Sequence, residues 1–186
     1  MNINQLYQQL TPNSSHPPVE QWNPSFCGDI DMQIKHDGTW YYMGTPITRL
    51  NMVSLFASVL ICDETHTPEK YYLITPVEKV GIQVEDVPFV VTDWQLLSTK
   101  NGQVIEYTTN LGDKGIINKD NPLTTAFSSY FNESKSYVTV RRNLRAVLHR
   151  NVFYQMIEQG HEKQINGQKH WVITSDDEDF SLGLMD

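Results

Sequence analysis

Arginines are the residues of this chain whose placement most suggests binding chemistry. Four of the five lie within ten residues, and Arg49 is the fifth. Guanidinium groups bind carboxylates and phosphates through paired hydrogen bonds. Arg49 and Arg150 stand at the predicted starts of two helices, where a cation opposes the helix dipole by about 0.3–1 kcal/mol. A compensating partner is therefore expected near them. The clustered arginines are Arg141, Arg142, Arg145 and Arg150.

Three interpretations of these cations stay open. The first is structural: the guanidinium groups pair with carboxylates in tight corners, namely Glu78, Glu85 and Asp86. The second is a site for a phosphate or carboxylate of a ligand, and the third is a solvated surface. The site hypothesis requires the cations to converge in one cleft. Its receiving groups are Arg49, Lys79, Arg141 and Arg150.

Asp29 and Asp31 form a second candidate constellation. They alternate within a predicted strand, so we expect their carboxylates on one face. Such a pair serves metal binding or acid–base chemistry when a third ligand converges. No companion DxD, HxH or E-x-x-H motif is present, so a structural role or a ligand contact is predicted. A metal-dependent hydrolase using both aspartates remains the alternative.

Other catalytic constellations find no support, and we predict a protein that is not an enzyme and holds no metal or cofactor. Cys27 has no histidine with a clear claim to act as its base. There is no GxGxxG, Walker or G-x-S-x-G motif. Several strand aromatics could line a pocket for a flat ring, although core packing would also use them. They are Trp40, Tyr41, Tyr42, Tyr71, Tyr72 and Trp94.

Composition restricts the class of protein. The 186 residues allow one domain or two small ones, and 39% hydrophobic residues are typical of a globular chain. A net charge of −8 disfavours nucleic-acid binding. Residues 1–10 lack the basic and apolar regions of a secretory signal, and no apolar run is long enough to span a membrane. We expect a cytoplasmic protein without a membrane partner; its oligomeric state stays open.

The predicted elements define an α+β fold of two small domains. An arm at 1–21, with a short helix and a linker, precedes domains at 22–86 and 87–175, and an acidic tail occupies 176–186. Period-two alternation predicts most of the strands, and helical periodicity predicts helices at 48–61 and 144–160, the second broken near 150. Residues 118–135 are expected to be irregular. The expected strands are 30–34, 39–43, 71–74, 80–84, 87–94, 103–109, 112–117, 137–140 and 170–174.

A repeated pattern indicates internal duplication. Pro46–Arg49 begins one predicted helix, which is followed by a turn and the strand Tyr72–Thr75. The segment 147–150 likewise precedes a helix, a turn and the strand Trp171–Thr174. We therefore predict a strand–helix–strand core present twice.

Several runs resemble the bacterial domain of unknown function 1285 family. They include Phe26–Met32, Asp37–Trp40, Thr75–Lys79 and Val84–Asp86. The resemblance implies two domains with a duplicated core, a second domain similar to pleckstrin-homology folds, and no established activity. It also implies a site at the domain interface for a nucleotide-like ligand, and a signalling role.

We therefore expect a ligand-binding or regulatory protein, with a hydrolase or a protein-interaction adaptor as alternatives. Two departures from the family's pattern weaken the transfer of ligand contacts. They are Asn121-Pro122 and the segment Thr174–Glu178.

Overall fold

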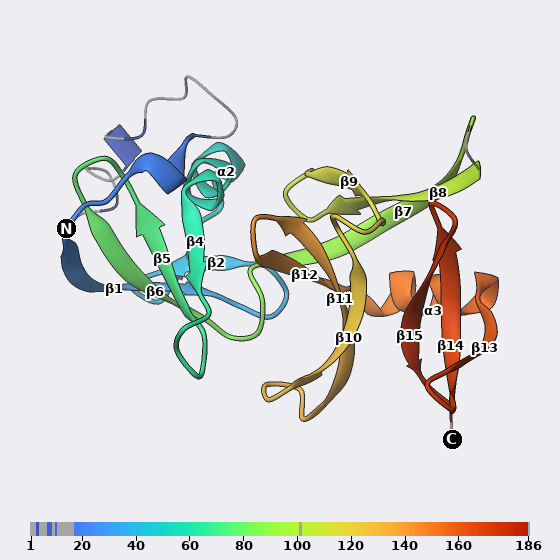
Figure 1. The fold of residues 1–186 in the computed structure, drawn as a ribbon. Coiled ribbons are helices and arrows are strands. Elements are labelled where there is room, and N and C mark those ends of the chain that lie inside the picture. The colour runs from blue at the N-terminus through green and yellow to red at the C-terminus, as the bar shows by residue number, and fades with distance from the viewer. Residues whose placement is uncertain (1–2, 4–6, 9, 11–16, 101, 186) are drawn as a thin grey trace. The chain divides into compact units, whose positions relative to one another are not determined.

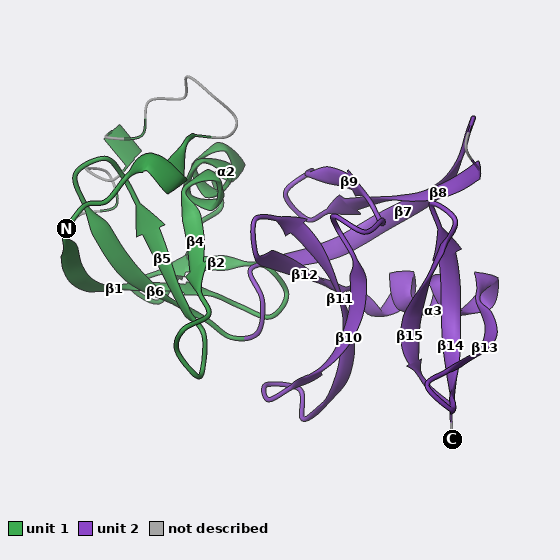
Figure 2. Ribbon diagram, in the orientation of Figure 1, with its two compact units in different colours: residues 1–85 green, residues 86–186 purple. Residues whose placement is uncertain are grey.

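A computed structural model describes residues 3, 7–8, 10, 17–100 and 102–185. The chain divides into two compact units, unit 1 at 1–85 and unit 2 at 86–186 (Figures 1 and 2). Most of the predicted N-terminal helix and linker lies outside the described residues. Among the described residues, no helix has the length and apolar character needed to cross a membrane.

Unit 1 is built on one six-stranded sheet with the order β3-β2-β1-β6-β5-β4. Only β1 and β6 pair in parallel; the other neighbours are antiparallel. The elements are η1 (Val19–Gln21), β1 (Phe26–Ile34), β2 (Trp40–Tyr42), β3 (Thr45–Pro46), α2 (Leu50–Ser58), β4 (Leu60–Asp63), β5 (Lys70–Ile74) and β6 (Lys79–Val84).

Helix α2 covers one face of this sheet. Phe56 of α2 stacks on Trp40 of β2 with ring centroids 6.4 Å apart, and both side chains are fully buried. Ile34 and Leu73 complete the core on this face. Because side chains alternate along a strand, Tyr72 on β5 and Gly81 on β6 belong to the opposite face. That opposite face carries the candidate site.

Unit 2 contains a curved six-stranded sheet, a helix and a separate three-stranded sheet. The six strands have the order β10-β11-β12-β7-β8-β9, with β12 and β7 parallel, and the small sheet has the order β13-β14-β15. The elements are β7 (Phe89–Thr99), β8 (Gly102–Thr109), β9 (Lys114–Ile116), β10 (Leu123–Ser128), β11 (Glu133–Arg141), β12 (Leu144–Leu148), α3 (Arg150–Gln159), β13 (His161–Ile165), β14 (Gln168–Ser175) and β15 (Glu178–Leu184).

The large sheet of unit 2 curls into a half-barrel. The hydroxyl of Tyr107 on β8 donates to the carbonyl of Thr139 on β11, 3.1 Å away, although two strands separate β8 from β11 in the sheet. The small sheet is hydrogen-bonded to the half-barrel on both sides, near β8 and near β11. Ser175 bonds the backbone of Ile105 and Ile117, and Ser136 donates to the carbonyl of Leu182.

Several sequence-based expectations were wrong. The helix expected at 48–61 ends at Ser58, and the β-branched segment after it forms the edge strand β4. Arg49, not Thr48, is the N-cap of α2. The break near residue 150 is confirmed, but 144–148 is a strand. Its near-continuous burial is typical of a strand covered on both faces, which periodicity cannot distinguish from a helix.

Two further segments are more ordered than expected. Residues 118–135 contain β10 and the start of β11. The acidic tail forms β15, in which Phe180 and Leu182 are buried. Two of its acidic side chains form ion pairs: Lys163 pairs with Asp179 at 2.6 Å, and Lys119 pairs with Glu178.

The two segments proposed as a duplication have different sheet partners. In unit 1, β5 belongs to the sheet that also contains β2 and β3, the two strands before α2. In unit 2, β14 lies in the three-stranded sheet, apart from the strands that precede α3. The order strand–helix–strand recurs, but the pairing around it does not.

Candidate functional site

A hollow lies on the uncovered face of the unit 1 sheet, centred on Gly81. We call it the Gly81 hollow; its volume is about 300 Å³. Asp29, Gly81 and Tyr72 form one row across β1, β6 and β5, as the strand register shows. The side chains around the row are Phe26, Ile30, Lys70 and Gln83.

The hollow exists because residue 81 has no side chain. A Cβ atom built on Gly81 would overlap the Oδ1 atom of Asp29, so the Asp29 carboxylate occupies the space left above the bare backbone. Gly81 itself is buried and lies between Asp29 and the ring of Tyr72. A glycine inside a strand weakens pairing, and it often marks a place where a ligand or another group approaches the backbone closely.

Tyr72 is the aromatic centre of the site. Lys79 places its Nζ atom 4.1 Å from the Tyr72 ring centroid, and Phe26 meets the same ring edge-on at 5.8 Å. Burial, together with the nearby carboxylates of Asp63 and Asp29, raises the pKa of Tyr72 above its usual value. The phenol therefore stays protonated and can donate a hydrogen bond.

Two opposite charges in this region remain without ion-pair partners. Among the described residues, neither Asp29 nor Lys79 has an oppositely charged group within 4.0 Å. Neither charge is paired at contact distance, although Lys79 also acts on Asp63, whose pKa is lowered by hydrogen bonds from Thr65 and to a smaller extent by the charge of Lys79. Asp29 and Lys79 are also the two members of the predicted site that the structure brings to one place.

Glu85 plays a structural role at the end of the first hairpin. Its carboxylate accepts hydrogen bonds from Lys35 Nζ (2.8 Å) and from the backbone N–H of His36 (2.9 Å). Burial raises the pKa of Glu85, but the hydrogen bonds from Lys35 and His36 outweigh it and lower the pKa to about 2. The predicted role as an arginine partner is wrong here, because a lysine and a histidine hold the carboxylate.

Asp86 and Arg141 are likewise held by unit 2. Asp86 accepts from Ser128 Oγ at 2.6 Å and from the Tyr137 hydroxyl at 3.1 Å. Arg141 pairs with Asp113 at 2.8 Å and lies over the ring of Phe89, 4.8 Å from its centroid. Ion pairing of Arg141 is thus confirmed, but with a carboxylate that the sequence did not indicate.

The other predicted site residues have separate surroundings, and the expected convergence of the cations in one cleft is wrong within each unit. Asp31 lies where the register of β1 shifts, and it does not line the hollow with Asp29. Arg49 caps α2 and lines a different pocket, with Thr48 and Leu50. Arg150 begins α3 and lies over the ring of Tyr154 at 5.5 Å.

The corner that contains Glu78 is held by a hydroxyl. The backbone N–H of Glu78 donates to Thr75 Oγ1 at 3.0 Å, so the carboxylate does not perform the corner-holding role expected of it. Its Oε2 atom is buried and has no hydrogen-bond partner among the described residues.

Sequence reasoning missed Gly81, Phe26 and Lys70 as parts of the site. Gly81 carried a usable signal, because it interrupts the apolar run from Val80 to Ile82 in a predicted strand. No sequence signal could have identified Phe26 and Lys70, since strand register alone brings them beside Tyr72. In the described part of the chain, no group of three His, Cys, Asp or Glu side chains is arranged to hold a metal ion.

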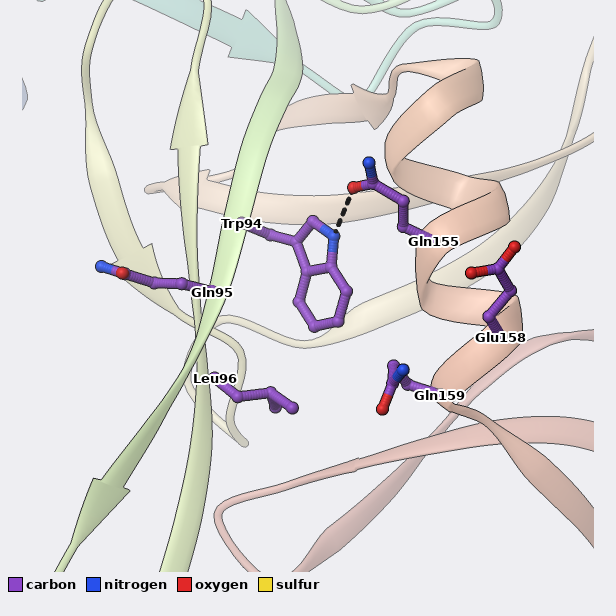
Figure 3. Close-up of a pocket in the computed structure, with 6 residues that line it drawn as sticks. All are labelled: Trp94, Gln95, Leu96, Gln155, Glu158 and Gln159. Carbon is purple, nitrogen blue, oxygen red and sulfur yellow. Dashed lines mark hydrogen bonds between the residues drawn. The ribbon is translucent and has the colours of Figure 1, made fainter.

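A second pocket lies in unit 2 between β7 and α3 (Figure 3). Trp94 and Leu96 project from β7, and the Trp94 indole donates to Gln155 Oε1 on α3 at 3.0 Å. Glu158 is the one charged residue among those lining it, and its charge is negative. This pocket is therefore a poorer match than the Gly81 hollow for an anionic ligand.

Fold and site define a two-domain, sheet-rich protein with a polar hollow on an open sheet face. The N-terminal domain of the DUF1285 family, a domain of unknown function, matches residues 17–87, and the C-terminal domain matches 88–182. The chain belongs to this family.

Solved structures of the same family agree with this membership. The chain is similar to a DUF1285 protein from Silicibacter pomeroyi DSS-3, with 38% identity and a TM-score of 0.84 over 98% of this chain and 95% of that one. It is also similar to one from Shewanella baltica OS155, with 26% identity and a TM-score of 0.53 over 69% and 91%. Among curated proteins, none matches the chain.

Proposed function

We propose that this protein is a non-catalytic binding module with a regulatory role, whose Gly81 hollow receives a small anionic ligand. One observation carries the proposal: Lys79 presents an ammonium group on the ring of Tyr72, a residue that lines the hollow, and it has no ion-pair partner among the described residues. The protonated Tyr72 hydroxyl offers an additional donor. Concave sites with a few convergent polar groups are the usual form of ligand pockets.

Binding explains the geometry better than hydrolysis. The hydrolase alternative requires Asp29 and Asp31 to act with a third ligand, but Asp29 alone lines the hollow. Among the described side chains, no third carboxylate, histidine or thiolate joins them in a cluster suited to a metal. A carboxylate with one aromatic and one cationic neighbour is better suited to hold a ligand than to activate water.

Finer parts of the expectation remain proposals. A nucleotide-like ligand, a location between the domains and a signalling role come from the family resemblance. Duplication and the pleckstrin-homology likeness rest on the recurring strand–helix–strand order and on the same resemblance. The cytoplasmic location rests on composition.

A thermal-shift panel of orthophosphate, AMP, ATP and small carboxylic acids tests the proposed function. We expect at least one anion to raise the melting temperature of the wild-type protein, and Lys79→Met to abolish that shift. Lys100→Met is the matched control, because Lys100 is an exposed lysine of unit 2. A shift that survives Lys79→Met would contradict the proposal, as would the absence of any shift in the wild-type protein.

A further inference from the structure

Asp29 and Lys79 are close enough to pair, yet they stay apart. They lie on adjacent strands, and Lys79 precedes by two residues the glycine that is in register with Asp29. Strand spacing then places their Cα atoms about 8 Å apart. Lys35 pairs with Glu85 at 2.8 Å from a directly opposite position, one residue beyond the last register pair of β1 and β6. Lys79 is offset from Asp29 by two residues and makes no such pair.

The local packing gives the two charges different neighbours: Asp29 lines the hollow, and Lys79 reaches it only through the ring of Tyr72. Lys79 leans toward β5, where its ammonium lies on the ring of Tyr72. Asp29 lies over Gly81, on the β1 side. The Asp29 carboxylate fills the space above the bare backbone of Gly81, and Tyr72 is in register with that glycine on the other side. A ligand that carries both charges would meet a complementary group at each end.

We propose that the preferred ligand of the Gly81 hollow is dipolar, with an ammonium group at Asp29 and a single carboxylate at Lys79. This inference rests on the proposed function, since it assumes that an anion binds beside Lys79. A neutral dipolar ligand adds no net charge to a chain that already carries −8. The carbon chain between the charges would contact Phe26 and Tyr72, which form the apolar part of the wall.

A matched ligand pair separates the dipolar inference from simple anion binding. Isothermal titration would compare 4-aminobutanoate with butanoate, which differ by the ammonium group, and 6-aminohexanoate would report the preferred charge separation. We expect the wild-type protein to bind an amino acid of this series at least tenfold more tightly than butanoate. Asp29→Asn should remove that preference, and Lys79→Met should weaken both compounds.

The outcomes distinguish two kinds of failure. If the protein binds butanoate as tightly as the amino acids and Lys79→Met abolishes binding, the dipolar inference is wrong while the proposed function stands. If the ammonium preference persists in Asp29→Asn, the cation is bound elsewhere and the inference is also wrong. If no compound of the series binds, the dipolar inference fails, and the anion panel decides the proposed function alone. Circular dichroism of each variant would verify that it is folded.

Discussion

Two sets of opposite charges, one in each unit, are arranged in different ways. In unit 2, Asp113 pairs with Arg141 at 2.8 Å, and the guanidinium is further supported by the ring of Phe89. In unit 1, Asp29 and Lys79 flank Tyr72 without pairing within the described part of the chain. Charged groups that are satisfied by protein partners stabilise a fold. Charged groups kept apart around an open surface are available for binding, and they contribute little to stability.

Two glycines show the same contrast in packing. A Cβ atom on Gly115 would lie 2.6 Å from Cζ of Tyr107, a ring that is almost completely buried. A Cβ atom on Gly81 would meet the end of an exposed aspartate. The first glycine makes room for a fixed part of the core, and the second makes room for a side chain that can move.

The largest expected effect is on the paired charges of unit 2. Asp113→Ala should lower the free energy of unfolding by about 1.5–3 kcal/mol, because it removes the carboxylate that bonds the largely buried guanidinium of Arg141 at 2.8 Å. Asp29→Ala should change it by less than about 0.5 kcal/mol, as is usual for exposed positions. Urea unfolding of both variants measures the difference. Equal losses of unfolding free energy in Asp113→Ala and Asp29→Ala would show that the paired and unpaired charges contribute alike to stability.

The glycine comparison gives the next effect. Gly115→Ala should cost about 1–3 kcal/mol, since the buried ring of Tyr107 must shift to accept a methyl group. Gly81→Ala should stay within about 0.5 kcal/mol of the wild type, because Asp29 can swing into solvent. The same urea experiment measures both. A large loss in Gly81→Ala would mean that the hollow is a packed structural element.

A smaller effect concerns acid stability. The pKa of Glu85 is lowered to about 2, so its hydrogen bonds stabilise the fold above the ordinary pKa of a glutamate, near 4.5. This contribution should disappear as the pH falls from about 4.5 to 2. Glu85→Gln should therefore show a shallower loss of unfolding free energy over that range. Identical pH profiles would show that Glu85 does not gain from its partners.

Alternation predicted most strands of both units, because a strand covered on one face places apolar residues at every second position. It failed at 144–148, where burial on both faces hides the period of two. It also failed at β4, which is too short to show a period. The predicted site was identified only in part. Asp29 and Lys79 could be selected as unusual charges, but their meeting at Tyr72 depends on the parallel pairing of β1 with β6. Local sequence does not encode that pairing.

Arg49, Arg141 and Arg150 were selected for their clustering and helix positions, which are features of sequence distance. Their actual neighbours depend on tertiary contacts: Phe89 and Asp113 for Arg141, and Tyr154 for Arg150. Charge clustering along a chain therefore identified the cations without identifying their roles.

The most direct test of the central claim is a two-dimensional NMR titration of the ¹⁵N-labelled protein with 4-aminobutanoate. We predict that the shifted backbone amides lie in 26–30, 70–72 and 79–83, the three segments that form the Gly81 hollow. Lys79→Met should suppress these shifts, whereas Lys100→Met should leave them unchanged. Shifts confined to unit 2, or equal shifts in the Lys79→Met variant, would contradict the assignment of binding to the unpaired charges of unit 1.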